Sequence, residues 1–315
     1  MNPTLQGYAA EVVEEVDPEQ LPVMAAEFAA IERLVLATPL LHAALTDTAV
    51  TGSARAAIMR DLLEGRVSEP ARRAAAFATS AVHAPESVAA LNWLALKTHR
   101  AAEGQHEAEP PLGLLQARRR VGGYARAIFE TLSTAQLEGM EDELFRFAQI
   151  VGSTPPLRSA LVDRDLAIEA RQGLVTQLLE GKVQPGTLAL VRYAIAGGRA
   201  RDIVGTLNWL VEQTAAARGW RIARVRAAAP VDDAQQSDLS ASLADLAGSP
   251  VELQVVIEPS LLSGAVIQIG DLQVDATARG RLDALREHLV PGGWDDRLTG
   301  KGRGPTHGKT TEGAV

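Results

Sequence analysis

A repeat with a period of 116 residues (123 minus 7) constrains the fold of this chain more than any other feature of its sequence. Gly7-Tyr8-Ala9 recurs as Gly123-Tyr124-Ala125, and Leu91-Asn92-Trp93-Leu94 recurs as Leu207-Asn208-Trp209-Leu210, with no gap between the pairs. Over the aligned hundred or so residues, roughly 30 are identical. Similar composition alone does not preserve register over such a length. The sequence therefore predicts a duplicated domain.

Each copy has the pattern of a run of short helices. In the second copy, apolar residues recur with the i, i+3, i+4 spacing of an amphipathic helix at Leu137, Met140, Leu144, Phe147, Ile150 and Val151. Prolines and glycines interrupt the pattern, for example at Pro155 and Gly181. The chain is therefore expected to be mainly α, with two homologous six-helix bundles at residues 1–104 and 121–220 and a linker at 105–120.

The last third of the chain changes period. Alternating apolar residues predict strands near 222–227, 251–257 and 265–269, and Gly270-Asp271 is typical of a two-residue hairpin turn before a further strand. A helix is expected over 232–247, and another carries Leu282, Leu285 and Leu289. The order β-α-β-β-β-α predicts a small α+β domain over residues 221–290. The glycine-rich stretch 291–315 is expected to be disordered.

Composition excludes several classes of function. The formal net charge of −8 argues against binding to nucleic acid, which requires concentrated Lys and Arg. The absence of cysteine excludes disulfides and thiolate metal sites, and the six histidines show no metal-ligand spacing. No arrangement of nucleophile and base stands out, so no catalytic, cofactor-binding or metal-ligating residue is predicted. We expect neither a signal peptide nor a transmembrane segment.

Residues 123–130 and 255–282 carry a resemblance to a known family. Gly-Tyr-Ala-Arg-Ala-Ile-Phe-Glu at 123–130, and the strand-turn-strand pattern through Glu-Pro-Ser-Leu-Leu-Ser-Gly at 258–264, resemble the delta subunit of F-type ATP synthase, known in mitochondria as the oligomycin-sensitivity-conferring protein. Ser263 replaces a common glycine, and Ala276-Thr277 replaces Gly-Ser. The residues that match the family's signature are Glu258, Pro259, Ser260, Gly264, Gly270, Asp271 and Asp275.

This resemblance implies a non-catalytic protein without a cofactor. A member of this family is a peripheral-stalk, or stator, subunit of the proton-translocating ATP synthase. It links the catalytic alpha/beta head to the b stalk, so that the head resists the torque of the rotor. Its helical domain grips the N-terminal helix of an alpha subunit, and its C-terminal domain holds the C-terminal end of b. The expected location is the cytoplasmic face of the bacterial plasma membrane, with membrane association only through the complex.

The resemblance further implies that a partner helix binds in a groove between the first and fifth helices of the second bundle. The candidates for that groove are Tyr124, Ala127, Ile128, Leu190, Val191 and Ala194. The same side chains would equally suit the bundle core. The first bundle, through Tyr8, Val12 and Phe77, is expected to engage a second alpha helix or to brace the stalk. Two alternatives remain open at this point, namely a helical adaptor or regulatory scaffold unrelated to ATP synthase, and an enzyme with a pocket between the bundles.

Overall fold

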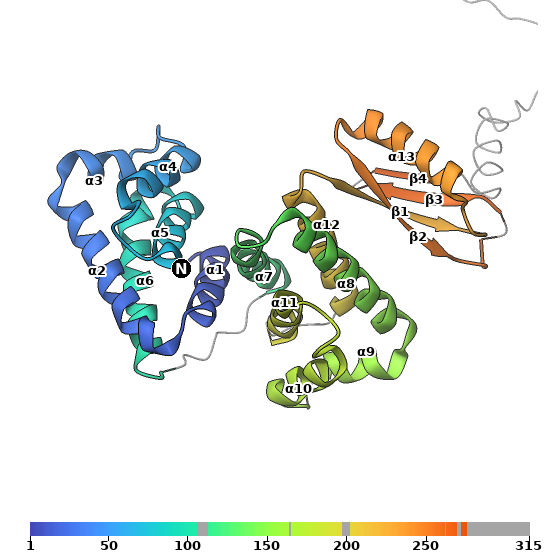
Figure 1. Ribbon diagram of the computed structural model, residues 1–315, viewed down its shortest axis with the longest axis horizontal. Coiled ribbons are helices and arrows are strands. Elements are labelled where there is room, and N and C mark those ends of the chain that lie inside the picture. The colour runs from blue at the N-terminus through green and yellow to red at the C-terminus, as the bar shows by residue number, and fades with distance from the viewer. Residues whose placement is uncertain (106–112, 164, 197–201, 262, 270–271, 276–315) are drawn as a thin grey trace, which may run out of the picture. The chain divides into compact units, whose positions relative to one another are not determined.

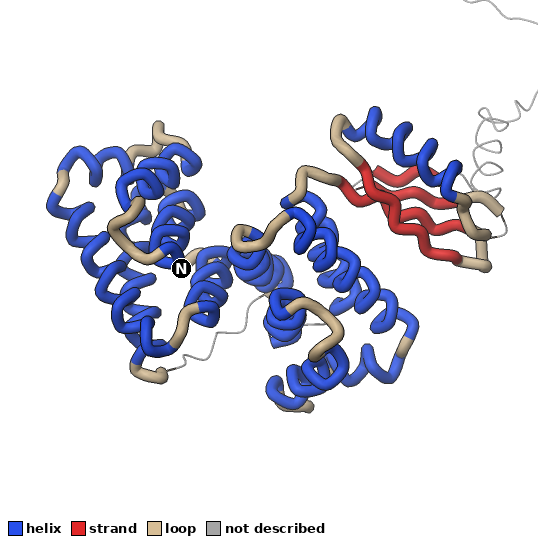
Figure 2. The backbone as a smooth tube through the Cα atoms, in the orientation of Figure 1, coloured by secondary structure: helices blue, strands red, loops and turns tan. Residues whose placement is uncertain are grey.

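The computed structural model describes residues 1–105, 113–163, 165–196, 202–261, 263–269 and 272–275, and these are mainly helical, with a small four-stranded mixed sheet towards the C-terminal end (Figures 1 and 2). They form two compact units. The first contains the described residues of 1–222 together with 244–252, and the second contains those of 223–243 and from 253 onwards. The expected fold class is therefore confirmed at this level.

The first six α-helices of the first unit form what we call the first helical series. Prolines occupy the first turn of several of these helices, where a missing N–H leaves no bond unmade. The Asn2 side chain accepts a hydrogen bond from the Thr4 N–H and so caps the first helix. The helices are α1 (Pro3–Glu15), α2 (Leu21–Ala37), α3 (Pro39–Thr46), α4 (Gly52–Leu63), α5 (Glu69–Ala81) and α6 (Ser87–Ala102), with 3₁₀ turns at Pro18–Gln20 and Ala84–Glu86.

The next six helices, the second helical series, follow the same order. They are α7 (Leu114–Phe129), α8 (Thr134–Ser153), α9 (Pro155–Val162), α10 (Ile168–Leu179), α11 (Pro185–Ala196) and α12 (Ile203–Ala217). Adding the offset of 116 to the bounds of α3 and of α4 gives the bounds of α9 and of α10. Ser133 and Gln136 form a capping box at the start of α8. These two pairs of corresponding helices therefore begin and end at corresponding sequence positions, whereas α7 and α8 begin a few residues earlier than the offset from α1 and α2 would place them.

The two series also share internal contacts. The Glu27 carboxylate accepts a hydrogen bond from the Ser68 N–H at 2.8 Å, and at the equivalent positions Glu143 accepts one from the Gln184 N–H at 3.1 Å. Each bond ties the second helix of its series to the segment before the fifth helix. The aromatic stacks Tyr8–Phe77 and Tyr124–Tyr193 are likewise equivalent, with ring centroids 3.9 and 4.0 Å apart.

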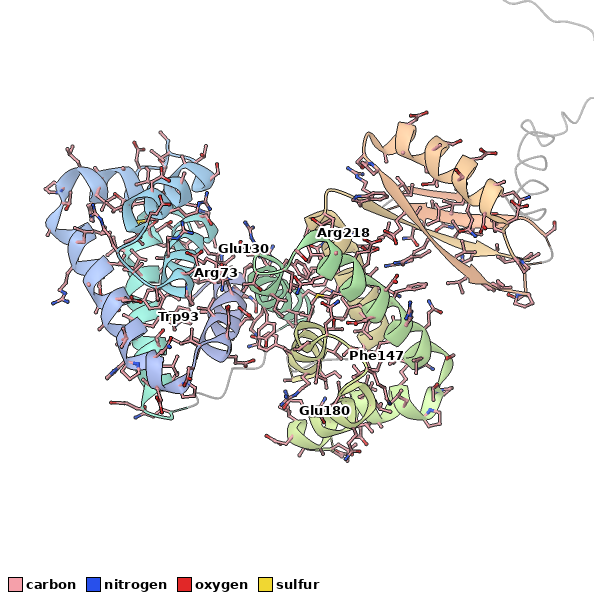
Figure 3. The ribbon with its side chains drawn as sticks, viewed as in Figure 1. Arg73, Trp93, Glu130, Phe147, Glu180 and Arg218 are labelled. Atoms are coloured by element: carbon pink, nitrogen blue, oxygen red, sulfur yellow. The ribbon has the colours of Figure 1, made fainter. Side chains whose placement is uncertain are left out.

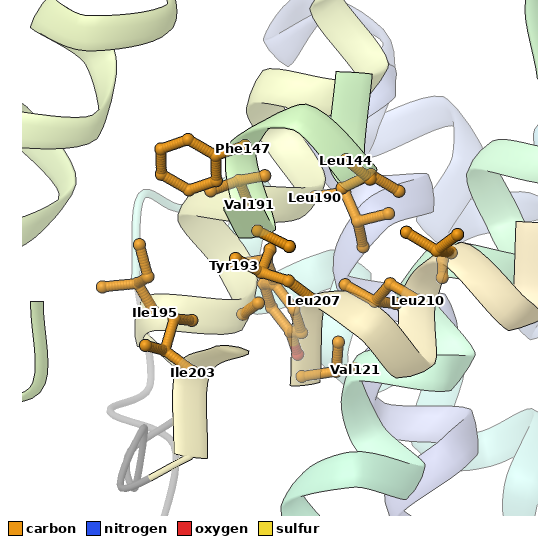
Figure 4. Packing of buried hydrophobic residues seen from close by; sticks show 14 of the residues in the cluster. Val121, Leu144, Phe147, Leu190, Val191, Tyr193, Ile195, Ile203, Leu207 and Leu210 are labelled. Atoms are coloured by element: carbon orange, nitrogen blue, oxygen red, sulfur yellow. The ribbon is translucent and has the colours of Figure 1, made fainter. Parts of the chain in front are cut away.

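Each series has its own hydrophobic core. In the second series the core includes the fully buried Leu144, Leu190, Leu207 and Leu210, drawn from α8, α11 and α12 (Figure 4). The first series is built the same way around residues such as Phe28. At about 25 cal/mol per Å² of buried apolar surface, each such side chain contributes about 1.5–3 kcal/mol. Packing of these apolar faces therefore stabilises the short helices, which are marginal in isolation.

The sheet consists of β1 (Arg221–Ala227), β2 (Val251–Ile257), β3 (Ala265–Ile269) and β4 (Leu272–Asp275), in the order β2-β1-β3-β4. α13 (Asp233–Ala247) connects β1 to β2. Val225 pairs with Ile267 in the antiparallel β1–β3 ladder, and Ile269 pairs with Leu272 in the antiparallel β3–β4 ladder. β1 and β2 run parallel, because bonds Arg221–Pro250 and Ala227–Glu258 join their starts and their ends.

The described strands and α13 agree with the expected β-α-β-β-β order. The structure differs in the segment expected as a linker, because α7 begins at Leu114 and the second half of 105–120 is helical. Ala117 and Arg120 are buried there, so packing extends the helix beyond the repeat. The hairpin residues 270–271, the helix expected near Leu282 and the expected disordered tail 291–315 lie outside the described residues.

No single helix among the described residues has the length and apolar composition to cross a membrane. One pair, residues 18–37 with α3, reaches that length and composition together but is bent by 99° at the break.

Candidate partner-binding site

The two helical series meet where α1 packs against α7, and two equivalent glycines allow that packing. A Cβ on Gly7 would overlap the carbonyl oxygen of Arg120, and a Cβ on Gly123 would overlap the carbonyl oxygen of Thr4. The backbones therefore approach more closely than any other residue would permit. The glycines that most clearly mark the repeat are thus the residues that join its two copies.

Two tyrosine–glutamate hydrogen bonds cross this interface in a related pattern. The Tyr8 hydroxyl donates to Glu130 Oε2 at 2.5 Å, and the Tyr124 hydroxyl donates to Glu14 Oε2 at 2.6 Å. Burial, followed by the nearby Glu130 charge, raises the pKa of Tyr8 well above its usual value. Burial and then Glu14 do the same for Tyr124. Both phenols therefore stay protonated and act as donors.

The contacts show that α1 and α7 run in the same direction. Gly7 lies against Arg120 and Tyr124, so it is level with Gly123, its own equivalent in the repeat. Each tyrosine then reaches a glutamate further towards the C-terminus of the opposite helix. Arg73 bonds both Glu15 at the end of α1 and the carbonyl oxygen of Ala127 near the end of α7, so the C-terminal ends of the two helices lie together and the helices are parallel.

From α5, Arg73 adds a contact that has no equivalent in the second series. Its guanidinium donates to the Ala127 carbonyl oxygen at 3.1 Å and pairs with Glu15 at 2.5 Å (Figure 3). The residue at the equivalent position is Ala189. From α7, the Arg126 guanidinium lies 5.1 Å from the centre of the Phe77 ring. The interface is therefore asymmetric in its charges although symmetric in its backbone.

All six residues predicted for the partner groove are buried in this chain. Their exposed fractions lie between 0% and 6%, and the set is Tyr124, Ala127, Ile128, Leu190, Val191 and Ala194. Leu190 and Val191 belong to the core of the second series. Ala127 belongs instead to the hydrophobic cluster of the first series, and Ala10 from α1 belongs to that of the second. The structure thus brings part of the predicted groove against α1, and binding of a partner helix there stays a prediction.

The residues predicted for the first bundle are buried as well. Tyr8 and Val12 lie on α1, and Phe77 on α5 stacks on the Tyr8 ring. Their contact with an outside partner also stays a prediction.

The signature residues build the connection between β2 and β3. Glu258 follows β2, its N–H donates to the Ala227 carbonyl at 2.8 Å, and its carboxylate accepts from Ser260 at 2.8 Å and pairs with Arg226 at 3.2 Å. Pro259, which has no N–H, stands where the ladder ends. Gly264 has φ of +84°, in the region that favours glycine, and precedes β3. These residues therefore fix how the chain re-enters the sheet.

The other signature residues contribute less to this picture. Asp275 is exposed at the end of β4, and Gly270 and Asp271 lie outside the described residues.

A buried ion cluster closes the end of the second series. Arg218, just after α12, pairs with Glu141 at 2.5 Å and with Glu252 at 2.7 Å, while Glu138 lies 3.7 Å away (Figure 3). The Arg218 and Glu141 side chains are 4% and 2% exposed. Burial, and then the Glu252 charge, raises the pKa of Glu141 to about 7. The cluster ties α8 and α12 to the start of β2.

Sequence reasoning missed the polar groups of the α1–α7 interface. Glu14 and Glu130 occupy equivalent positions of the repeat, as do Tyr8 and Tyr124. The repeat in the sequence could therefore have indicated the two tyrosine–glutamate pairs. Arg73 and Glu11 carried no such signal, because their equivalents are alanines. Their positions depend on packing between segments far apart in the chain.

The described residues offer little for chemistry. No group of three or more His, Asp or Glu side chains is arranged to hold a metal ion. A cavity of about 570 Å³ is lined by residues 1–4, Val82, Glu86, Ala89 and Arg119. Its charged side chains are Glu86 and Arg119, and its lining includes no histidine.

Comparisons with known proteins give a consistent result. A family model described as ATP synthase delta (OSCP) subunit matches residues 121–289. The ATP synthase subunit delta of Salinispora arenicola (strain CNS-205) is 31% identical over 278 residues, which are 88% of this chain and 92% of that protein. That of Nocardia farcinica (strain IFM 10152) is 34% identical over 250 residues, covering 79% of this chain and 83% of that protein.

A shorter match has higher identity. The ATP synthase subunit delta of Thermobifida fusca (strain YX) is 40% identical over 163 residues, which are 52% of this chain and 61% of that protein. Among solved structures, a chain of the Toxoplasma gondii mitochondrial ATP synthase hexamer has a TM-score of 0.35 and 18% identity, covering 55% of this chain and 98% of that chain. A TM-score this low supports no structural conclusion.

Proposed function

The chain belongs to the ATP synthase delta (OSCP) subunit family, and we propose from this that it is a non-catalytic peripheral-stalk subunit that links the alpha/beta head to the b stalk. In that role it holds the head against the torque of the rotor. The observation that carries the proposal is the family match over residues 121–289, which covers the second helical series from within α7 onwards and the sheet. On this proposal the chain is associated with the cytoplasmic face of the membrane through the complex.

The two helical series are, on this proposal, two copies of one six-helix bundle. Helix bounds that differ by the repeat offset support it, as do the equivalent Glu27–Ser68 and Glu143–Gln184 contacts. A conserved set of internal contacts is what duplication of a folded domain leaves behind.

A clamp needs two separate surfaces, and the chain has two units of different architecture to provide them. The alpha subunit's N-terminal helix is assigned to the second series, at the surface of α7 and α11 around Tyr124, Ala127 and Ala194. The C-terminal end of b is assigned to the sheet unit. The first series would take a second alpha helix or brace the stalk through Tyr8 and its neighbours.

The burial of the groove residues gives this assignment a specific consequence. α1 covers Tyr124 and Ala127, so a partner helix that binds to them must displace α1 from α7. Binding energy then has to offset the loss of the α1–α7 contacts. A chain whose α1 is already loosened should therefore bind the partner helix more tightly.

The test is calorimetric titration of the full-length chain with a peptide of the alpha subunit's N-terminal helix from the same organism. One site per chain is expected, with tighter binding in Gly7→Ala, because the new methyl group overlaps the Arg120 carbonyl and loosens α1 without altering the α7–α11 surface. Gly173→Ala is the matched control, since nothing lies within 4 Å of that position. Two sites would give the first series the same task, whereas no binding by the folded chain would refute the alpha-helix assignment.

A further inference from the structure

Glu11 is a buried carboxyl group that the fold does not require. It lies on α1 with 8% of its surface exposed, and its Oε2 atom is buried without a hydrogen-bond partner. The equivalent residue in the second series is Ala127, which is fully buried in the same interface. The helix therefore packs at this level with a methyl group, and the carboxyl group is an addition specific to the first copy.

The surroundings of Glu11 disfavour a negative charge. The titratable and charged groups that face it are Tyr8, Glu14 and Glu15 from α1, Arg73 from α5, and Tyr124 and Glu130 from the α7 segment. Arg73, the cation of this group, is already bonded to Glu15 and to the Ala127 carbonyl. Burial, reinforced by the Glu15 charge, raises the pKa of Glu11 to about 8.

Separation of α1 from α7 would leave both cores intact. Leu5, Tyr8 and Val12 hold α1 in the core of the first series, and the α7 side chains hold that helix in the core of the second. The two clusters exchange only Ala10 and Ala127. Opening of the joint would therefore take only Ala10 and Ala127 out of the hydrophobic clusters to which they belong.

We propose that the contact between α1 and α7 is a proton-linked joint, in which neutral Glu11 keeps the two helical series together and ionised Glu11 drives them apart. An ionised carboxylate without a partner is stabilised by reaching water, and opening the joint gives it that access. Opening also uncovers Tyr124 and Ala127 on α7. The joint is a property of the isolated chain and does not depend on the stator role.

The absence of cysteine from the sequence allows a direct measurement of opening. Ala43→Cys and Ser159→Cys place spin labels at equivalent exposed positions of α3 and α9. We expect one narrow distance distribution at about pH 6 and a longer, broader one above a midpoint near the pKa of about 8, with unchanged helical circular dichroism. A distribution that stays the same up to about pH 10, or opening accompanied by loss of helix, would overturn the proposal.

Variants assign the transition to one carboxyl group. In both Glu11→Gln and Glu11→Ala the joint should stay closed up to about pH 10. Both substitutions are tested so that a folding defect in one of them does not decide the result. Glu15→Gln should weaken the opening, moving its midpoint to higher pH or abolishing it, because it removes a neighbouring negative charge and frees Arg73 to pair with ionised Glu11 in the closed joint. Glu64→Gln, at the exposed C-cap of α4, should leave the midpoint unchanged. Opening of both Glu11 variants at the wild-type midpoint would contradict the assignment.

Discussion

Replacement of one glycine should separate the two helical series without unfolding either. In Gly123→Ala the new Cβ overlaps the carbonyl oxygen of Thr4, a backbone atom that cannot rotate away. α1 and α7 must therefore move apart by about 1 Å or more, and a gap of 0.5–1 Å already removes a quarter to a half of the dispersion energy between facing atoms. The Tyr8–Glu130 and Tyr124–Glu14 bonds stretch with it.

The expected magnitude is a balance of opposing effects. Each tyrosine–glutamate bond contributes about 1 kcal/mol, less than the roughly 1.5–3 kcal/mol of bonds to buried charged acceptors, because both glutamates are exposed. Reduced burial of Ala10 and Ala127 removes about 1 kcal/mol more. Alanine in place of glycine stabilises the helix itself by about 1 kcal/mol. We therefore expect a net destabilisation of about 2 kcal/mol.

Denaturant unfolding of the full chain, together with the spin-label distance between residues 43 and 159, tests this expectation. Gly173→Ala is the control, because that helical glycine has open space around it and its equivalent in the first series is already Ala57. The control should stabilise the chain by about 1 kcal/mol. If Gly123→Ala stabilises the chain equally and leaves the distance unchanged, close packing of α1 on α7 is refuted.

Three further substitutions test other parts of the structure. Arg55→Met should destabilise the first series by about 3–5 kcal/mol, because three buried or partly buried carbonyl oxygens lose its guanidinium, and thermal unfolding would show this as a lower Tm. The pKa of Glu141 is raised from 4.5 to about 7, so the stability linked to it is complete below about pH 4.5 and is lost as pH rises through about 7. Glu141→Gln should remove that dependence, which unfolding at about pH 5 and pH 8 would detect, and an unchanged slope would exclude Glu141 as its source. Gly264→Ala should destabilise the sheet unit by about 1–2 kcal/mol because of its φ of +84°, seen as a lower denaturant midpoint for the sheet signal, whereas Gly248→Asn at φ of +65° should change it little.

The sequence by itself determined the local structure and the family. Prolines in the first turn and aspartates just after the last residue mark where α3 and α9 begin and end, and the alternation around Val255 sets a strand, because these patterns depend on neighbours a few residues away. The segment from Glu258 to Gly264 identified the family for the same reason, since a turn of fixed geometry restricts its own residue types.

Tertiary structure decided what those elements bury. From the sequence alone, Tyr124 and Ala127 suit a partner-binding groove and a bundle core equally well. The packing of α1 against α7 shows what surrounds them in this chain. The strand order β2-β1-β3-β4 is likewise a matter of pairing between distant segments. From the sequence, Glu11 would be expected to be a solvent-exposed carboxylate like the other acidic residues near the N-terminus. In the structure it is buried, its Oε2 atom has no hydrogen-bond partner, and it lies near Tyr124 and Glu130, more than a hundred residues away in the chain.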